Sequence, residues 1–165
     1  MLAPSDLRPR KELNLSLGVL IGSGDRIVLF TLPFAAVGVI LNIAYPQLFN
    51  VGGPGAALRL LSLVMLAAGI ANWAWSVFLI LTNVPRGRLI TSGPYALVKH
   101  PLYTGMALLV LPSVGFLFNS WLGVALGIVL YVATRMFAGS EEEALSKAFG
   151  AAWDEYSSDV KISWL

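Results

Sequence analysis

The residue types that could perform chemistry are concentrated between Leu89 and Tyr103, in the stretch LITSGPYALVKHPLY. This stretch holds the only histidine of the chain, His100, together with Tyr95 and Tyr103. An imidazole and two phenols held on a defined backbone could form a binding or catalytic site. The structural alternative is a well-capped loop with interfacial aromatic residues, and these residue types alone do not decide between the two.

The same stretch carries signals that would fix its backbone. The Ser-Gly-Pro sequence at 92–94 predicts a turn, because glycine permits positive φ and proline presets φ. One helical turn is expected over 95–99. His100 precedes Pro101, which favours an extended conformation at His100 and ends that turn. A further helix is therefore expected to begin with Pro101 in its first turn.

The composition indicates an integral membrane protein. The 165 residues are 57% hydrophobic and 12% charged, whereas about 25% of the residues of a soluble domain are charged. The net charge of +2 indicates an orientation signal and no nucleic-acid partner. The absence of cysteine excludes disulfides, a thiolate nucleophile and a Cys-based metal site. A single histidine excludes a His-rich metal site, so no metal is expected.

Four apolar segments predict an all-α membrane protein with about four transmembrane helices, at 27–49, 57–83, 102–118 and 121–138. The last two segments are expected to form a tight hairpin over 102–138, because only two residues separate them. The third segment would span roughly 25 Å as a helix, which is short against a hydrocarbon core of about 30 Å. Tilting or a sunken turn would reconcile these lengths. Within the second segment, Asn72 is expected to make an interhelical hydrogen bond.

The segments divide the chain into a cytosolic or interfacial N-terminal part at 1–26, two transmembrane helices at 27–83 and a candidate catalytic region at 84–165. Residues 13–24 are apolar but too short to cross a membrane, so they either lie in the interface or lead into the first helix. Ten of the eleven basic residues lie at the N-terminus, within 84–100 or from Arg135 onward. The positive-inside rule therefore places both termini in the cytosol.

The pattern changes at Ser140, which is followed by three glutamates. A serine followed by acids is typical of a helix N-cap, because the hydroxyl accepts a backbone N–H and the macrodipole favours carboxylates. A cytosolic or interfacial C-terminal helix is therefore expected from Ser140 to about Tyr156. Its apolar residues recur at three- and four-residue spacing and either rest on the membrane or cover 89–103; they are Leu145, Phe149, Ala152, Trp153 and Tyr156.

The predicted hairpin brings two groups of residues to one face of the membrane. The groups are Tyr95, His100 and Tyr103 before the hairpin and Arg135, Glu141 and Glu142 after it. Carboxylates beside aromatic rings suit a cationic ligand, and an arginine suits an anionic one. Each residue also has a structural interpretation, since the acids can cap a helix and the arginine can snorkel. Their convergence favours a site.

Two segments resemble a known family: GRLITSGPYALVKHPLYTG and, after the hairpin, EEEALSKAFGAAWDEY. They are similar to the isoprenylcysteine carboxyl methyltransferases and, more broadly, to membrane methyltransferases that include the phosphatidylethanolamine N-methyltransferases. The shared pattern is S-G-x-Y-x-x-x-[RK]-H-P-x-Y-x-G, then E-E-x-x-L-x-x-x-F-G-x-x-[YW]-x-x-Y. The resemblance covers about residues 85–160, and residues 1–80 match only as hydrophobic helices.

This resemblance implies an S-adenosylmethionine pocket open to the cytosol. It also implies a lipophilic acceptor from the bilayer, either an isoprenylcysteine-like carboxylate or a phospholipid amine headgroup. Carried over by position, the implied cofactor-binding residues are Gly87, Arg88, Leu89, Ile90, Tyr95, His100, Pro101, Leu102, Tyr103 and Glu141, with Glu142 as its neighbour. Lys99 joins them as a candidate cofactor-binding residue, because its ammonium suits the carboxylate of the cofactor. The candidate catalytic residues are His100, Glu141, Glu142 and Arg135, of which the first three could help to remove a proton from an amine.

Two positions depart from the family pattern. Eukaryotic relatives commonly have a histidine where Gly87 stands, so only backbone contacts are expected there. Their substrate-contacting arginine corresponds to Phe137, and the nearest arginine is Arg135. This second departure weakens the expectation of a carboxylate acceptor.

Two other classes of protein fit the sequence less well. Integral-membrane sterol reductases resemble the C-terminal architecture of this family but use NADPH. Beyond Arg86, Arg88 and Lys99, the sequence shows no cluster for the phosphates of that cofactor. A non-enzymatic membrane scaffold would use 89–103 only to cap the hairpin. The sequence does not identify the methyl acceptor or the oligomeric state.

Overall fold

The structure is a computed structural model that describes the backbone of residues 13–162 and the side chains from Gly24 to Ile162. The tail predicted over residues 1–12 lies outside this range. Within it the chain is helical, and its only β-type pairing is an isolated bridge between Asn50 and Ser120. The elements in chain order are α1 (Leu13–Ala44), α2 (Pro46–Phe49), α3 (Ala56–Asn83), η1 (Val84–Arg86), η2 (Gly93–Ala96), α4 (Pro101–Gly105), the π-helical turn η3 (Met106–Val110), α5 (Leu111–Leu117), α6 (Leu122–Phe149) and α7 (Ala151–Asp159).

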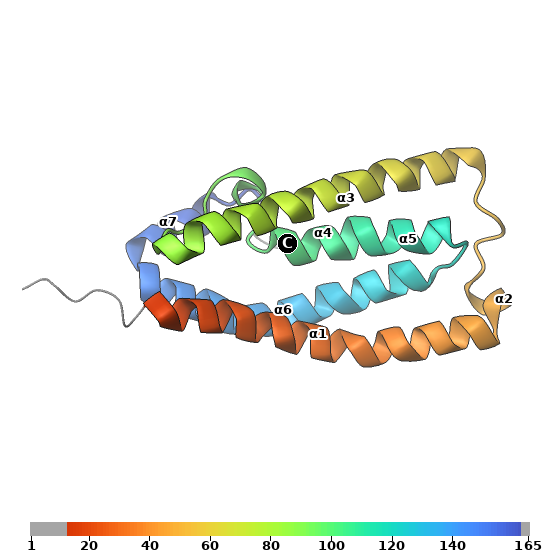
Figure 1. Cartoon of the computed structure of the whole chain (residues 1–165), viewed down its shortest axis with the longest axis horizontal. Helices are drawn as coiled ribbons and strands as arrows, with labels where there is room; N and C mark the ends of the chain where they lie inside the picture. The colour runs from red at the N-terminus through yellow and green to blue at the C-terminus, as the bar shows by residue number, and fades with distance from the viewer. Residues whose placement is uncertain (1–12, 163–165) are drawn as a thin grey trace, which may run out of the picture.

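The long helices lie side by side and alternate in direction (Figure 1). Helix α1 packs on α6, α6 packs on α5, and α5 packs on α3. The residues between α3 and α4 gather at one end of this bundle, next to α7. We call this the site end. The opposite end, called the far end, holds the connections from α1 to α3 and from α5 to α6.

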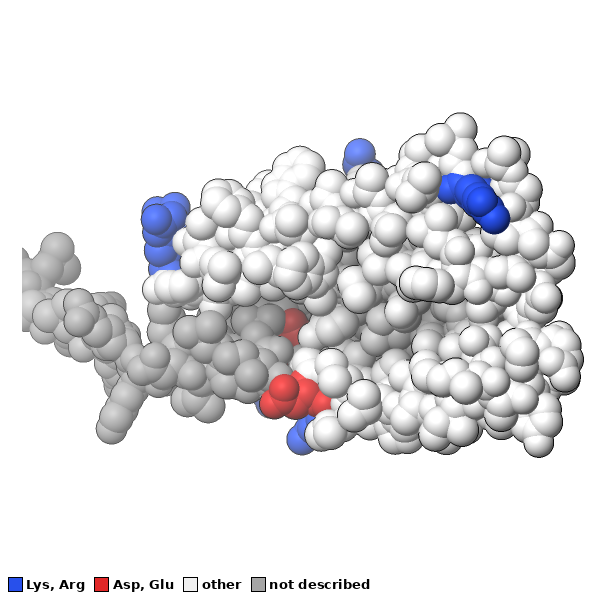
Figure 2. Space-filling view, turned by 45° about the vertical axis from the view of Figure 1, so that its right-hand side comes forward, with Lys and Arg blue, Asp and Glu red and all other residues white. Residues whose placement is uncertain are grey.

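The expected all-α membrane architecture is confirmed. Three described helices are long and apolar enough to cross a bilayer, at Gly24–Ala44, Ala56–Arg86 and Leu122–Phe149. The apolar helix at Pro101–Leu117 is shorter than these three, as the sequence predicts. Figure 2 shows a face on which few side chains are charged, and many large hydrophobic side chains of the described residues are exposed. Such a surface is stable against lipid and unfavourable in water.

Helix α1 begins at Leu13, so the apolar residues 13–24 lead into the first transmembrane helix. The helix expected over 27–49 ends earlier, at Ala44, and Pro46 begins the separate short helix α2. This early end has a steric cause, because a proline disfavours the α conformation in the residue before it. Pro33 lies inside α1 without ending it.

The helix start predicted at Ser140 is wrong. Helix α6 runs through this position to Phe149, and the Ser140 hydroxyl donates to the Phe137 carbonyl oxygen at 3.0 Å. The break lies at Gly150, whose φ of 53° is a conformation that favours glycine. The residues after Ser140 are mostly good helix formers, so the helix continues until this glycine. The predicted C-terminal helix is therefore the end of α6 followed by α7.

The predicted hairpin is confirmed: α5 ends at Leu117 and α6 begins at Leu122. Its two helices approach closely because glycines face the neighbouring backbone. A Cβ at Gly127 would overlap the carbonyl oxygen of Ala107. The hairpin therefore returns the chain to the site end. Its closely packed helix interface leaves little room for larger side chains at these glycines.

The start of α4 is held by the interhelical hydrogen bond expected of Asn72. Its Nδ2 donates to the Pro101 carbonyl oxygen at 2.8 Å. Gly105, one turn along α4, leaves no room for a side chain against the Asn72 amide. Helix α3 thus fixes the position of the turn that follows His100.

Candidate active site

A cavity of about 250 Å³ lies at the site end. Its volume is close to the lower end of small-molecule pockets, which measure about 300–1,000 Å³. It is lined by Ile80, Val84, Gly87, Arg88, Leu89, Ile90, Tyr95, Lys99, His100, Leu102, Tyr103, Glu141, Leu145, Phe149, Trp153 and Tyr156. Most of these side chains are apolar or aromatic and a few are charged, which is the usual composition of a small-molecule site.

The chain between α3 and α4 is shaped by two left-handed glycines. Gly87 ends η1 with φ 64°, and its N–H donates to the Val84 carbonyl oxygen at 3.0 Å. This turn directs the backbone of 87–90 along the cavity. Gly93 has φ 63° and lies against the Trp75 ring, which a Cβ would approach to 3.1 Å. A side chain at Gly93 would therefore be both strained and crowded.

His100 and Pro101 adopt the local structure that the sequence predicts. His100 has φ −123° and precedes α4, and Pro101 occupies the first turn of that helix. The 3₁₀ helix η2 supplies the expected turn after Ser92. His100 is buried, and Tyr103 lies one turn along α4, so both side chains reach the cavity.

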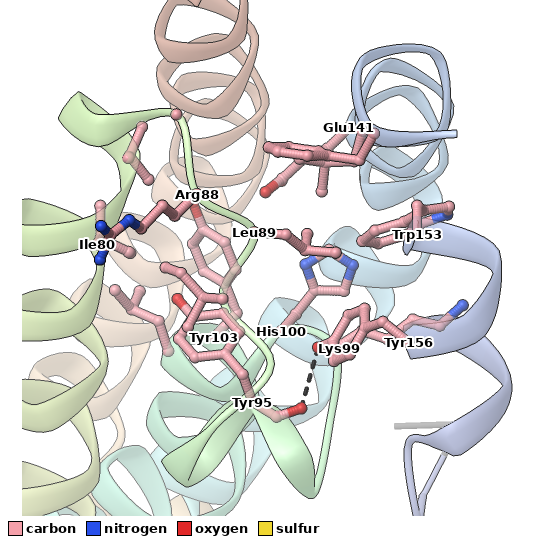
Figure 3. Close-up of a pocket in the computed structure, with 16 residues that line it drawn as sticks. Ile80, Arg88, Leu89, Tyr95, Lys99, His100, Tyr103, Glu141, Trp153 and Tyr156 are labelled. Carbon is pink, nitrogen blue, oxygen red and sulfur yellow. Dashed lines mark hydrogen bonds between the residues drawn. The ribbon is translucent and has the colours of Figure 1, made fainter. Parts of the chain in front are cut away.

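Helix α7 closes one side of the cavity. Trp153 and Tyr156 are buried and line it. The Tyr156 hydroxyl donates to the Tyr95 carbonyl oxygen at 2.9 Å (Figure 3). Beyond the helix, the N–H of Ile162 donates to the Leu97 carbonyl oxygen at 3.0 Å. The sequence allows the apolar residues of the C-terminal region either to rest on the membrane or to cover 89–103. The structure shows that they cover 89–103.

The two adjacent glutamates have different positions. Glu141 is 7% exposed and lines the cavity. Glu142 is not among the lining residues and instead pairs with Lys99 at 2.9 Å and with Nε2 of His100 at 3.3 Å. The Lys99 ammonium also lies 5.8 Å from the centre of the Trp153 ring, within range of a cation–π contact.

The surroundings of two phenols near the cavity raise their pKa values above the ordinary value of 10.0. Burial raises the pKa of Tyr95, and the negative charge of Glu141 raises it further. Burial also raises the pKa of Tyr156 to about 12, with a smaller contribution from Glu142. Both hydroxyls therefore remain hydrogen-bond donors at neutral pH, and their rings offer faces to a cation.

The structure brings most of the predicted site residues together. Ten of them line the cavity: Gly87, Arg88, Leu89, Ile90, Tyr95, Lys99, His100, Leu102, Tyr103 and Glu141. Pro101 is fully buried and does not line it, and Glu142 lies behind Lys99 and His100. Arg135 is exposed on α6 and does not line the cavity either. Glu141 lies six positions after it, which places the two on different faces of a helix with 3.6 residues per turn.

Six lining residues lie outside the set of site residues that the sequence predicts: Ile80, Val84, Leu145, Phe149, Trp153 and Tyr156. The last four belong to the apolar stripe of the C-terminal region, whose spacing was the available signal. Ile80 and Val84 lie four residues apart at the end of α3, within an apolar run that gives no indication of which side faces the cavity. Only the packing of α3 on α4 reveals their role.

The residues around the cavity can bind a ligand that carries a positively charged group and a negatively charged group. Figure 3 shows Glu141 reaching the cavity from α6, Tyr103 from α4 and Arg88 from the chain after α3. A buried carboxylate beside aromatic rings suits a cationic group. The Arg88 side chain extends toward Ile80 and offers a guanidinium to an anionic group.

Comparison with known families agrees with this geometry. The phospholipid methyltransferase family model matches residues 55–152, which is more than half of the chain and extends from the start of α3 to the start of α7. No curated protein sequence matches the chain. The matched region contains nearly all of the residues that line the cavity. The helical membrane architecture, the cavity and this match together show that the chain belongs to the phospholipid methyltransferase family.

Proposed function

We propose that this protein is an S-adenosylmethionine-dependent methyltransferase that acts on a lipophilic acceptor. The observation that carries the proposal is the buried carboxylate of Glu141 in a mostly apolar, aromatic-lined cavity at one end of a membrane bundle. A carboxylate beside aromatic rings suits the positively charged groups of this cofactor. Family membership supports the same assignment.

The residues present fit S-adenosylmethionine. This cofactor has a sulfonium and an ammonium that Glu141 and the rings of Tyr95 and Tyr103 could meet, and a carboxylate for Arg88. The backbone at Gly87 and the apolar side chains of the cavity would hold its adenosyl part. When bound, the cofactor would supply a methyl group already activated by the positive sulfur.

The protein would contribute alignment and the exclusion of water. Helix α7 and the residues 87–90 both line the cavity, and Leu89 packs against the buried cluster of Trp153 and Tyr156, so these segments would shield a ligand from solvent. An amine acceptor must lose a proton during transfer, and Glu141 or His100 is placed to accept it. Neither Tyr95 nor Tyr156 would serve as a base, because their raised pKa values keep both phenols protonated.

The proposed acceptor is a phospholipid amine headgroup rather than an isoprenylcysteine-like carboxylate. Phe137, at the position of the substrate-contacting arginine of relatives, packs against the Phe30 ring at 5.8 Å in the α1–α6 contact. It does not line the cavity, and Arg135 is exposed elsewhere on α6. The α6 residues that line the cavity are Glu141, Leu145 and Phe149, so this helix offers no arginine to a carboxylate acceptor there. Ile80 of α3 and Val84 of η1 would guide the lipid part from the bilayer.

We further propose that the site end faces the cytosol, with both termini on that side. The basic residues Arg86, Arg88 and Lys99 lie at this end, as the positive-inside rule requires. Membrane lipids would surround the bundle and supply the acceptor. Cytosolic exposure of the cavity would give it access to a soluble cofactor.

Two assays test the function. Calorimetric titration of purified protein with S-adenosylhomocysteine and with NADPH separates a methyltransferase from a sterol-type reductase and from a scaffold that binds neither. Transfer of a radiolabelled methyl group to total lipid extract, with a prenylcysteine analogue in parallel, identifies the acceptor class. The proposal fails if NADPH binds and S-adenosylhomocysteine does not. Transfer to the prenylcysteine analogue alone would refute the amine acceptor only.

A further inference from the structure

Glu142 occupies an unusual place beside the cavity. It does not line the cavity, yet its carboxylate contacts two side chains that do. Oε2 lies 2.9 Å from the Lys99 ammonium, and Oε1 lies 3.3 Å from Nε2 of His100. Glu142 is 42 or 43 residues from these partners in sequence, so the contacts join α6 to the chain before α4. Its side chain is only 28% exposed, which limits screening by water.

The charges around the cavity explain why such a contact matters. Three basic side chains line it, Arg88, Lys99 and His100, against the single acid Glu141. Without a further negative charge, this excess would oppose a cationic ligand. Glu142 offsets the charge of Lys99 and that of His100 when the imidazole is protonated, and it does so from behind them. The cavity surface keeps its hydrogen-bond donors while its positive potential falls.

We propose that Glu142 is a positioning residue that makes the cavity selective for a positively charged ligand by fixing Lys99 and His100 and offsetting their charge. This inference rests on the proposed function, since S-adenosylmethionine carries a positive sulfur and its demethylated product does not. Glu142 would then touch neither cofactor nor acceptor. Its effect would appear as a preference between ligands of equal shape and different charge.

The chain provides a matched control next to this residue. Glu143 also pairs with a lysine, Lys147, at 2.6 Å, but its side chain is 68% exposed and does not line the cavity. Glu143→Gln therefore removes one carboxylate from the same turn of α6 without altering the charges at the cavity. Any general effect of losing an acid from this turn will appear in both variants.

The experiment compares two ligands of similar shape. S-adenosylhomocysteine is neutral where the methyl group would be carried, and sinefungin has an ammonium group there. We expect Glu142→Gln to weaken sinefungin binding about tenfold more than S-adenosylhomocysteine binding, the order expected for one charge acting at an effective dielectric constant of about 20. Glu143→Gln should leave the ratio of the two affinities unchanged. Equal loss for both ligands, or no loss, would overturn the proposal.

Two further measurements cover the case in which Glu142→Gln does not fold. Lys99→Met removes a cation from the cavity while Glu142 remains, so it should shift the affinity ratio toward sinefungin. A ratio that stays the same or moves the other way contradicts the charge argument. If the parent protein binds neither ligand, the proposed function fails separately, and the positioning role is then decided by NMR.

The NMR measurement uses the fact that the chain has a single histidine, so the ¹⁵N resonances of labelled imidazole belong to His100 alone. The Nε2 resonance should move in Glu142→Gln and stay in place in Glu143→Gln. If Glu142→Gln does not fold, the conservative variant Glu142→Asp, whose carboxylate is held farther from Nε2, should produce the shift. Unchanged Nε2 resonances would refute the contact on which the inference rests.

Discussion

The Tyr156 hydroxyl donates a hydrogen bond to the main-chain carbonyl oxygen of Tyr95 at 2.9 Å, across 61 positions of sequence. This contact joins the last described helix to the 3₁₀ turn before α4 and so closes the cavity on one side. Trp153 and Val160 are buried in the same small cluster. The shape of the cavity therefore depends on residues outside the polar motif around His100.

We expect Tyr156→Phe to loosen α7 without unfolding the bundle. The variant keeps the ring and removes one hydrogen bond, which is worth about 1 kcal/mol. Amide hydrogen exchange should become faster in 151–159 and remain unchanged in α3. Tyr45→Phe is the control, because Tyr45 is exposed at the far end. Equal exchange in α7 of the parent and of Tyr156→Phe would show that the bond contributes nothing to closure.

The raised pKa of Tyr156 predicts a loss of stability at alkaline pH. The folded phenol titrates near pH 12 and the unfolded phenol near its ordinary pKa of 10.0. Below pH 10 both states are protonated and the contribution is fully present. Between about pH 10 and 12 the unfolded state releases the proton first, so the free energy of unfolding decreases as the pH rises. This decrease should be smaller in Tyr156→Phe than in Tyr45→Phe when unfolding in detergent is measured across this range.

The sequence predicts the ends of the polar stretch well because local chemistry determines them. The turn at 92–94 follows from a glycine and a proline, and the start of α4 follows from Pro101. The convergence of Tyr103 and Glu141 at one cavity follows from a hairpin whose connection is too short for any other path. None of these features depends on a contact between residues that are distant in sequence and unconnected by a short turn.

Prediction from the sequence fails where two local signals compete or where tertiary packing determines the position of a side chain. Ser140 followed by glutamates resembles an N-cap, but the strong helix formers after it continue α6 to Gly150. The adjacent Glu141 and Glu142 are alike in sequence, and only the packing of α6 shows that one lines the cavity and the other pairs with Lys99.

Substitution of glycines along α6 tests how closely the two helices of the hairpin pack. Gly127→Ala should destabilise the protein by about 1–3 kcal/mol, because its Cβ would overlap the Ala107 carbonyl oxygen and force the helices apart. Gly139→Ala is the matched control on the same helix, since nothing lies within 4 Å of its Cβ position. That variant should be neutral or stabilised by up to about 1 kcal/mol through helix propensity. Thermal unfolding in detergent compares them, and equal midpoints would contradict the close packing.

Glu141→Gln tests the group on which the proposed function depends. We expect it to weaken binding of S-adenosylhomocysteine, whose amino group remains charged, by about 1–3 kcal/mol, the scale for a hydrogen bond to a charged group. Glu143→Gln should bind like the parent, because Glu143 is exposed and lies outside the cavity. Titration calorimetry supplies both affinities. If Glu141→Gln binds as the parent does, the buried carboxylate has only a structural role.

The orientation of the bundle can be tested because the chain has no cysteine. Single cysteines at Ser92 and Ser158 report on the site end, and one at Gln47 reports on the far end, since all three positions are exposed. In oriented vesicles, an impermeant thiol reagent on the cytosolic side should label positions 92 and 158 and leave 47 unlabelled, as the positive-inside rule requires. Reagent on the opposite side should give the reverse. If 92 and 158 react only from the opposite side, the cavity faces away from the cytosol and a cytosolic cofactor could not reach it. If 92 and 158 react from different sides, α7 cannot cover 89–103 in the membrane, and the shared site would be lost.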